Sequence, residues 1–235
     1  PTRIVMYERT SVHPEFKEQK LGYYLESHTD FLSWMYDTVE ELKKTYIGKF
    51  PDRPFIWSEY SHSMGNSTGN LSENWDFIRT ERQMQGGFIW DFLDQGLAAI
   101  DKDGTKYWKF GGDFAPEHYH TDGNFCLNGI VNADRTPHPA LEEVKHVYQN
   151  AHASWSDENK NEIMLYNENF FTSLAAYKLE FVLLKNGIEI ESYTHNLQTL
   201  PQETAYIPLT FKSELENSSD YHVNIYGKLK KTDAL

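Results

Sequence analysis

The sequence has one cysteine, Cys126, and no hydrophobic run of 18 residues. A single cysteine excludes a disulfide within the chain, and the missing run excludes an ordinary membrane-spanning helix. Basic residues are also scarce, since 22 Lys and Arg stand against 35 Asp and Glu, for a net charge of −13. Nucleic-acid binding needs a basic patch, and the short run at residues 228–231 is too small to form one. We therefore expect no nucleic-acid partner and no membrane contact.

The chain also lacks an initiator methionine, because it begins at Pro1, and it shows no signal-like segment. This start indicates a piece of a longer protein or a processed product. The 235 residues suffice for one large or two ordinary domains. Aromatic residues make up 15% of the chain, and such rings serve either as flat platforms for sugars or as core filling.

Short apolar runs alternate with helical patterns over the first 95 residues. The runs that we predict as strands are residues 3–8, 29–36, 55–59 and 88–92, with a loop at 9–28. A capping box at Thr38 predicts one helix, and a second is predicted between Gly69 and Arg82. This order indicates about half of an eight-stranded α/β (TIM) barrel.

The next segment, residues 96–135, has little periodicity. Asp101–Gly104 predicts a hairpin turn, and the glycine and aromatic content of the rest favours an ordered active-site loop. Pro139 at a first helical position then predicts a closing helix.

After about residue 150 the pattern changes to the alternation of strands, with a tight turn at Asn186-Gly187. We expect an all-β, immunoglobulin-like sandwich of about seven short strands. The predicted fold is therefore α/β at residues 1–150, the C-terminal half of a barrel, followed by a β-sandwich at residues 151–235.

Glu59 is the first candidate for chemistry, because it ends a buried strand and barrel enzymes place their active sites at the C-terminal ends of strands. Tyr60, His62 and Trp57 are close in sequence and are groups that can hold a carboxylate ionised. From these residues alone, a glutamate that pairs with an arginine at a strand end is an equal alternative.

Longer motifs carry a resemblance to a known family. SEYSHSMGNS is followed by QGGFIWDFLDQ, then WKFGGDF, then NFCLNGIVNADRTPHPALEEVKH. In this order, from about Arg3 to Tyr148, they resemble the lactose-cleaving β-galactosidases of glycoside hydrolase family 2. The resemblance implies retaining hydrolysis of terminal β-galactosides through a covalent galactosyl-enzyme intermediate.

The resemblance also implies roles for single residues. Glu59 matches the catalytic nucleophile, and Tyr36 matches a tyrosine that hydrogen-bonds it. His62 matches a histidine that grips galactose hydroxyls, and Trp90 matches the floor of the sugar pocket. Trp34 departs from the family's proline in front of the methionine-tyrosine pair.

Metal sites are implied in the same way. Phe125, through its carbonyl, and Asn128, through its side chain, match the residues that bind Na⁺ beside the galactose. Glu8 matches a strand-end glutamate, for which we expect a hydrogen-bonding role near the substrate. The resemblance implies Mg²⁺ as well, with ligands outside this segment.

The main departure is a missing acid/base residue. The family's acid/base glutamate follows an asparagine, but the Asn-Glu pairs here, Asn161-Glu162 and Asn167-Glu168, lie in the predicted sandwich. We therefore expect this segment to be inactive alone and to need the rest of a parent polypeptide. The resemblance implies a homo-oligomeric full-length enzyme of bacterial type, cytoplasmic or periplasmic.

Two alternatives stay open. One is another family-2 glycosidase, a β-glucuronidase or β-mannosidase, although no Arg or Lys clusters with Asn128 to bind a glucuronide carboxylate. The other is a non-catalytic sugar-binding or assembly fragment.

Overall fold

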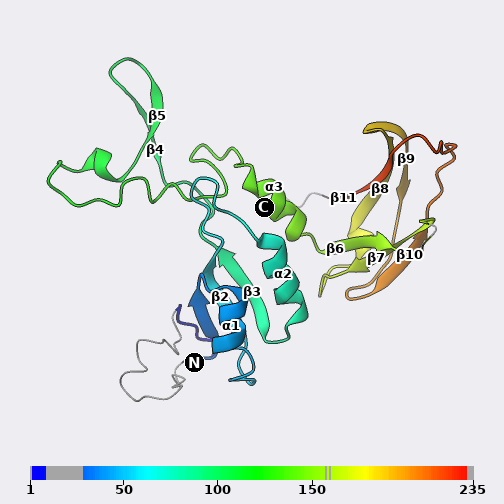
Figure 1. Ribbon diagram of the computed structural model, residues 1–235, viewed down its shortest axis with the longest axis horizontal. Helices are drawn as coiled ribbons and strands as arrows, with labels where there is room; N and C mark the ends of the chain where they lie inside the picture. Colours follow the sequence, from blue (N-terminus) through cyan, green and yellow to red (C-terminus); the bar gives the residue numbers. More distant parts are fainter. Residues whose placement is uncertain (1, 9–28, 157, 159, 232–235) are drawn as a thin grey trace. The chain divides into compact units, whose positions relative to one another are not determined.

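The computed structural model describes residues 2–8, 29–156, 158 and 160–231 (Figure 1). The chain divides into two compact units, Pro1–Tyr148 and Gln149–Leu235. The loop predicted at residues 9–28 lies outside the described residues. Within the described part, no helix is long and apolar enough to cross a membrane.

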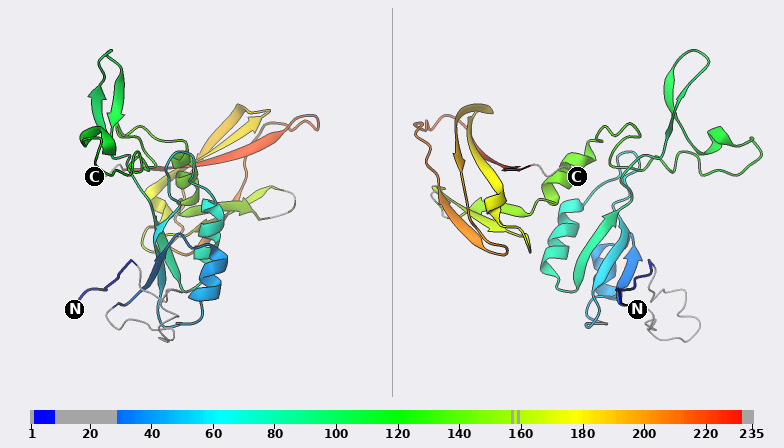
Figure 2. Two further views of the ribbon diagram at one scale, coloured as in Figure 1. Left: turned by 60° about the vertical axis from the view of Figure 1, so that its left-hand side comes forward. Right: turned by 180° about the vertical axis from the view of Figure 1, so that it is seen from behind.

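The first unit is built on a three-stranded parallel sheet in the order β1-β2-β3. Helices connect the strands, and both pack on one face of the sheet (Figure 2). In chain order the elements are β1 (Leu32–Met35), α1 (Val39–Thr45), β2 (Phe55–Tyr60), α2 (Leu71–Thr80) and β3 (Met84–Ile89).

The capping box predicted at Thr38 is confirmed. The Thr38 hydroxyl accepts a hydrogen bond from the Glu41 backbone N–H at 3.3 Å, and the Glu41 carboxylate accepts one from the Thr38 N–H at 2.8 Å. These contacts satisfy N–H groups that the first turn of α1 would otherwise leave unpaired. They fix where the chain turns from β1 into α1.

Two of the strand predictions are wrong. Residues 3–8 form no strand, although the Val5 carbonyl accepts a hydrogen bond from the Asp30 N–H at 2.8 Å. The third sheet strand covers Met84–Ile89 rather than residues 88–92. Gly87 lies inside this strand because a Cβ there would sit 2.9 Å from the Tyr60 ring and 3.0 Å from Trp57 Cβ. The glycine thus permits side-chain packing across β2 and β3.

One extra residue, Ser58, interrupts the pairing of β2 with both neighbours. Trp57 pairs with Trp34 and Glu59 with Met35, while Trp57 and Tyr60 pair with Gly87 and Ile89 of β3. Such a β-bulge shifts the alternation of side chains by one residue. Phe55, Trp57 and Tyr60 are all buried as a result, and Glu59 is released from the apolar core.

The helix-covered face of the sheet holds the core of the first unit. It includes Leu42 of α1, Phe77 of α2 and Val144 of α3 (Ala140–Val147), packed around Trp57. Between β3 and α3, the predicted hairpin is confirmed as β4 (Leu97–Ile100) and β5 (Lys106–Lys109), followed by a short 3₁₀ turn, η2 (Gly111–Phe114).

The second unit contains two three-stranded antiparallel sheets, β10-β7-β6 and β11-β8-β9. Side chains from both sheets share one core around Phe181. Six strands are present among its described residues, rather than about seven; the immunoglobulin-like topology stays a prediction. The elements are β6 (Ala151–Trp155), β7 (Glu162–Asn167), η3 (Leu174–Ala176), β8 (Tyr177–Lys185), β9 (Ile188–His195), β10 (Thr204–Pro208) and β11 (Tyr221–Leu229).

The tight turn between β8 and β9 is confirmed. Asn186 and Gly187 have φ angles of 51° and 81°, the positive values that a two-residue hairpin turn requires.

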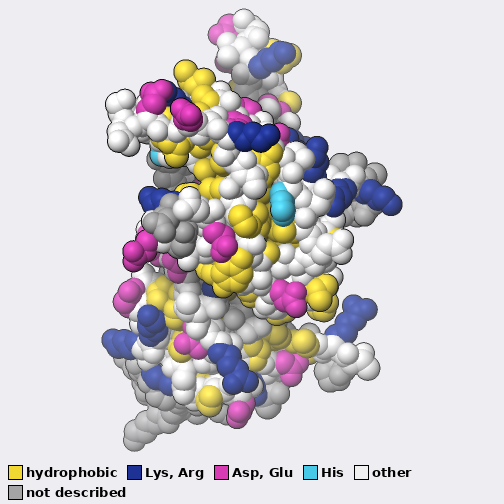
Figure 3. Space-filling model, turned by 90° about the vertical axis from the view of Figure 1, so that its right-hand side faces the viewer, with side chains coloured by type: hydrophobic (Ala, Val, Ile, Leu, Met, Phe, Trp, Pro, Cys, Tyr) yellow, Lys and Arg dark blue, Asp and Glu magenta, His cyan; other side chains and the backbone are white. Residues whose placement is uncertain are grey.

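Hydrophobic side chains also lie among the charged ones on the surface (Figure 3). Phe171 is 98% exposed and Ile188 70% exposed in the second unit. Single exposed apolar side chains of this kind are common on protein surfaces.

Asn167 is the main buried polar residue of the second unit. It has no exposed surface, and its side-chain N–H groups donate to the carbonyls of Thr172 and Leu200, each at 3.0 Å. Its Oδ1 accepts from the Asn169 side chain at 2.9 Å. One amide therefore ties the end of β7 to the segments before η3 and before β10.

We expect Asn167→Ala to lower the free energy of unfolding of the second unit by about 3 kcal/mol, because buried carbonyls lose their donors. Urea unfolding of the chain measures this change. The matched control is Asn224→Ala on β11, whose side chain donates to the exposed Tyr226 hydroxyl; its effect should stay within about 0.5 kcal/mol. Equal losses in both variants would contradict the structural role of Asn167.

Candidate active site

The site is centred on a hydrogen bond between two strand ends. The Tyr36 hydroxyl donates to Glu59 Oε2 at 2.7 Å, and the Tyr36 backbone N–H donates to the Glu59 carbonyl at 3.0 Å. Tyr36 follows β1 with a φ of 59°, a left-handed conformation that is uncommon for a tyrosine. The end of β1 is thus joined to β2 by its backbone and by its side chain.

Burial and the neighbouring carboxylate keep the Tyr36 phenol neutral. Partial burial of the Tyr36 ring raises the pKa of its phenol, and the hydrogen bond and negative charge of Glu59 raise it further. The charge of Asp91 contributes in the same direction. Tyr36 therefore remains a protonated donor to the Glu59 carboxylate at neutral pH.

His62 and Phe125 extend the pair into an aromatic cluster. The His62 ring centroid lies 6.0 Å from that of Tyr36 and 5.1 Å from that of Phe125. The His62 Nε2 atom is buried and has no hydrogen-bond partner. A ligand group at this place could supply the missing partner.

Backbone hydrogen bonds connect Trp90 to the segment that carries His62, and connect Asn128 to the residue after Trp90. The Trp90 N–H donates to the Tyr60 carbonyl at 3.1 Å, and the Trp90 carbonyl accepts from the Ser63 N–H at 2.8 Å. The next residue, Asp91, donates its N–H to the Asn128 carbonyl at 2.9 Å. Trp90 remains 39% exposed, so part of its ring can contact a ligand.

Other expected neighbours of Glu59 lie elsewhere. Trp57 and Tyr60 are buried in the core, where the Tyr60 hydroxyl bonds Tyr148 and accepts from Trp75 Nε1 at 2.8 Å. Neither donates a hydrogen bond to Glu59, because both side chains face the core. Glu8 is exposed, and its backbone carbonyl accepts a hydrogen bond from the Ser58 hydroxyl at 2.9 Å.

Buried polar atoms without partners are concentrated here. Among the described residues there are seven such side-chain atoms, and four belong to this neighbourhood: Ser61 Oγ, His62 Nε2, Asp91 Oδ1 and Asn128 Oδ1. Native interiors leave few polar groups unpaired, so such a cluster indicates a place for a ligand. Sequence reasoning singled out His62 and Asn128 but not Ser61 or Asp91; the only signal for Asp91 was its position after Trp90.

Asn128 is suited to a cation with a preference for oxygen. Its side chain is 3% exposed, and its neutral Oδ1 accepts no hydrogen bond. Hard cations bind oxygen ligands of this kind. No group of three or more His, Cys, Asp or Glu in the described part of the chain could hold a metal ion.

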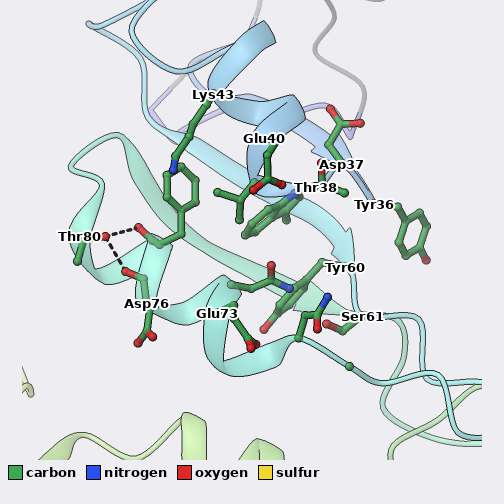
Figure 4. Close-up of a pocket in the computed structure, with 16 residues that line it drawn as sticks. Tyr36, Asp37, Thr38, Glu40, Lys43, Tyr60, Ser61, Glu73, Asp76 and Thr80 are labelled. Atoms are coloured by element: carbon green, nitrogen blue, oxygen red, sulfur yellow. Dashed lines mark hydrogen bonds between the residues drawn. The ribbon is translucent and has the colours of Figure 1, made fainter.

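A separate cleft of about 640 Å³ lies between α1 and α2 (Figure 4). Glu40 and Lys43 of α1 line it, opposite Glu73 and Asp76 of α2, and the ring of Tyr36 points away from it at the rim. Glu59, His62 and Trp90 are not among its lining residues. We therefore place the site at the strand ends rather than in this cleft.

Comparison with known proteins finds two family profiles that match the chain. The profile described as "Glycosyl hydrolases family 2, TIM barrel domain" matches residues 1–153, and "Beta-galactosidase, domain 4" matches residues 163–235.

Several curated β-galactosidases are similar to the chain over most of its length. The protein from Halalkalibacterium halodurans is 36% identical over 232 residues, which are 98% of this chain and 21% of that protein. The one from Priestia megaterium is 37% identical over 223 residues, 94% of this chain and 20% of that protein. The one from Photobacterium profundum is 40% identical over 176 residues, 73% of this chain and 17% of that protein.

The chain thus spans about a fifth of the length of these relatives. The barrel-domain match covers residues 1–153 of 235, well over half of the sequence. This chain belongs to glycosyl hydrolase family 2.

Proposed function

We propose that the chain is the nucleophile-bearing part of a retaining β-galactosidase. Glu59 attacks the anomeric carbon of a terminal β-galactoside and forms a galactosyl ester, which water then hydrolyses. The observation that carries the proposal is the 2.7 Å hydrogen bond from the protonated Tyr36 to Glu59 at the strand ends. The β-galactosidase relatives support the choice of sugar.

The contacts of Glu59 suit a nucleophile. The Tyr36 hydroxyl donates to Oε2, which fixes the rotation of the carboxylate group. The other oxygen, Oε1, takes no hydrogen bond from the described residues and is left to attack the sugar. A carboxylate held on rigid strand ends meets the requirement for a near-attack geometry.

The surrounding residues suit a sugar. The half-exposed ring of Trp90 can pack on the apolar face of a galactose ring. His62 Nε2 and Asp91 Oδ1 have no protein partners, and sugar hydroxyls can both donate and accept hydrogen bonds. Binding of galactose would therefore satisfy buried groups that the protein leaves unpaired.

Asn128 Oδ1 and the Phe125 carbonyl would hold Na⁺ beside the sugar. When bound, the ion orients a galactose hydroxyl and adds positive charge to the pocket. Asn128 is buried with its oxygen unpaired, which fits this role. The Mg²⁺ site would lie in the remainder of the longer polypeptide.

The second carboxyl group must come from outside this chain. A retaining glycosidase needs two carboxyl groups about 5–5.5 Å apart. Glu168 pairs with His152 at 2.7 Å, and Glu162 Oε2 accepts from the Ser156 hydroxyl at 3.0 Å. Both glutamates therefore have structural partners within the second unit.

The exposed apolar side chains of the chain would contact the rest of the parent polypeptide and further subunits.

Covalent trapping tests the role of Glu59. We expect the full-length enzyme that contains this chain to be labelled on Glu59 by a dinitrophenyl 2-deoxy-2-fluorogalactoside, as found by peptide mass spectrometry. Glu59→Gln should lower kcat by ~10⁴-fold or more, because the nucleophile is lost.

The control is Glu73→Gln on α2, which should retain labelling and activity. A label on a different residue would overturn the assignment. A preference for β-glucuronides or β-mannosides over β-galactosides would keep the nucleophile but change the substrate. Galactose binding that survives Glu59→Ala, without any labelling of the wild type, would favour a non-catalytic sugar-binding fragment.

The isolated 235-residue chain should have no measurable activity, because one carboxyl group of the pair is missing. Release of nitrophenol from nitrophenyl β-galactoside measures this directly. Hydrolysis by the isolated chain that disappears in Glu59→Gln would show that it contains its own acid/base residue.

The protonation of Tyr36 gives a further prediction. In Glu59→Gln we expect the pKa of the Tyr36 phenol to fall, because the carboxylate that opposes its ionisation is gone. It should stay above the ordinary value of about 10, since burial and Asp91 still act. Tyrosine ¹³Cζ NMR of the chain, assigned with Tyr36→Phe, measures the pKa.

The same shift makes stability depend on pH. The raised pKa stabilises the folded chain below about pH 10, and this contribution is lost as pH rises through the folded-state pKa. The loss should be smaller in Glu59→Gln than in the wild type. Glu117→Gln, on an exposed loop, is the control and should leave the pKa of Tyr36 unchanged. An unchanged pKa in Glu59→Gln would contradict the hydrogen-bonded pair.

A further inference from the structure

Two loop segments at the strand ends are joined by a series of backbone hydrogen bonds. One segment, residues 90–95, carries Trp90, and the other, residues 125–131, carries Asn128. The bonds run from Asp91 N to Asn128 O (2.9 Å), Ile130 N to Asp91 O (3.0 Å), Val131 N to Phe92 O (3.1 Å), Asp94 N to Val131 O (3.0 Å) and Gln95 N to Cys126 O (2.9 Å).

The Asp94 carboxylate lies between these segments. Its Oδ1 accepts from the Gly129 N–H at 2.8 Å, and its Oδ2 pairs with His138 Nε2 at 2.8 Å. The side chain of Asp94 is only 13% exposed. A carboxylate this deeply buried is costly unless donors satisfy it, and here both oxygens are satisfied.

Gly129 makes the contact possible. A Cβ on Gly129 would lie 2.3 Å from the Asp94 backbone nitrogen and 2.4 Å from the Leu93 carbonyl carbon. These are backbone atoms, which cannot move aside as a flexible side chain can. The residue before Gly129 is Asn128, so the close approach fixes the backbone that carries the unpaired Asn128 oxygen.

We propose that Asp94 is a positioning residue for the sugar and Na⁺ pocket. Through the Gly129 N–H it sets the position of Asn128 Oδ1 relative to Trp90 and Asp91. His138 completes the clamp, because its Nε2–H donates a hydrogen bond to the second carboxylate oxygen. The inference rests on the proposed function, because it assigns Asn128 to the Na⁺ beside the galactose.

The experiment uses the full-length enzyme with Asp94→Ala, Asp94→Asn, Asn128→Ala and the double variant Asp94→Ala/Asn128→Ala. In Asp94→Ala, the Na⁺ concentration for half-maximal effect should rise about tenfold, as expected when a residue that orients a ligand is lost. Asp94→Asn keeps an oxygen for the Gly129 N–H and should recover part of this loss. The readouts are KM as a function of Na⁺ and, without substrate, the rise in melting temperature when Na⁺ replaces K⁺.

The double variant separates positioning from general destabilisation. If Asp94 acts through Asn128, adding Asp94→Ala to Asn128→Ala should change the Na⁺ response little, because coupled sites are not additive. Asp134→Ala is the control, since Asp134 is exposed and bonds Thr136 within its own turn; its Na⁺ response should match the wild type.

Additive losses, or no rescue by Asp94→Asn when both variants fold, would overturn the inference. Labelling of Glu59 is independent of these variants. If Glu59 is labelled and the losses are additive, the inference about Asp94 fails and the proposed function stands. If Glu59 is not labelled, the proposed function itself fails.

Discussion

A single extra residue in β2 decides where the Glu59 carboxylate points. In a regular strand Glu59 would lie on the same face as Phe55 and Trp57, which is the face packed against the helices. A carboxylate there would be buried among apolar side chains at a cost of several kcal/mol. The bulge at Ser58 gives that core position to Tyr60 and leaves Glu59 able to reach Tyr36. The same bulge therefore completes the packing of the core and places the Glu59 carboxylate.

Tyr36 likewise has two roles at the end of β1, one for its backbone and one for its side chain. Its positive φ ends the strand, and its backbone N–H still bonds the Glu59 carbonyl. The side chain can then reach the Glu59 carboxylate from the position directly after β1. Because both ends of the contact are held by the sheet, the hydrogen bond at 2.7 Å is supported by rigid elements. The raised pKa of Tyr36 follows from the same proximity, since ionisation would place two negative charges side by side.

Much of the element order could be predicted from local signals, and the errors have physical causes. The capping box at Thr38 and the Asn186-Gly187 turn act within a few residues, so the sequence alone reveals them. The strand at Met84–Ile89 begins earlier than the predicted residues 88–92, because Gly87 lies inside it and leaves space for Trp57 and Tyr60 of the adjacent strand. The bulge at Ser58 has no local signature. The bulge depends on pairing with two neighbouring strands at once, and the position of Asp91 depends on backbone bonds with Asn128 and Ile130, which are distant in the sequence.

The division of the proposed site between this chain and the rest of its polypeptide sets a strict geometric condition. The chain supplies Glu59 on β2, while a strand outside it must bring the second carboxyl group to about 5–5.5 Å. Adjacent residues along a strand are about 3.3 Å apart, so a slip of one residue at an open edge of the sheet would separate the two groups beyond the distance for retention. Under the proposed function, the register at the outer edges of β1 and β3 would control chemistry as well as folding. Contacts such as the Asp94 clamp act within the first unit and do not set that register, which in the proposed enzyme would come from pairing with strands of the longer polypeptide.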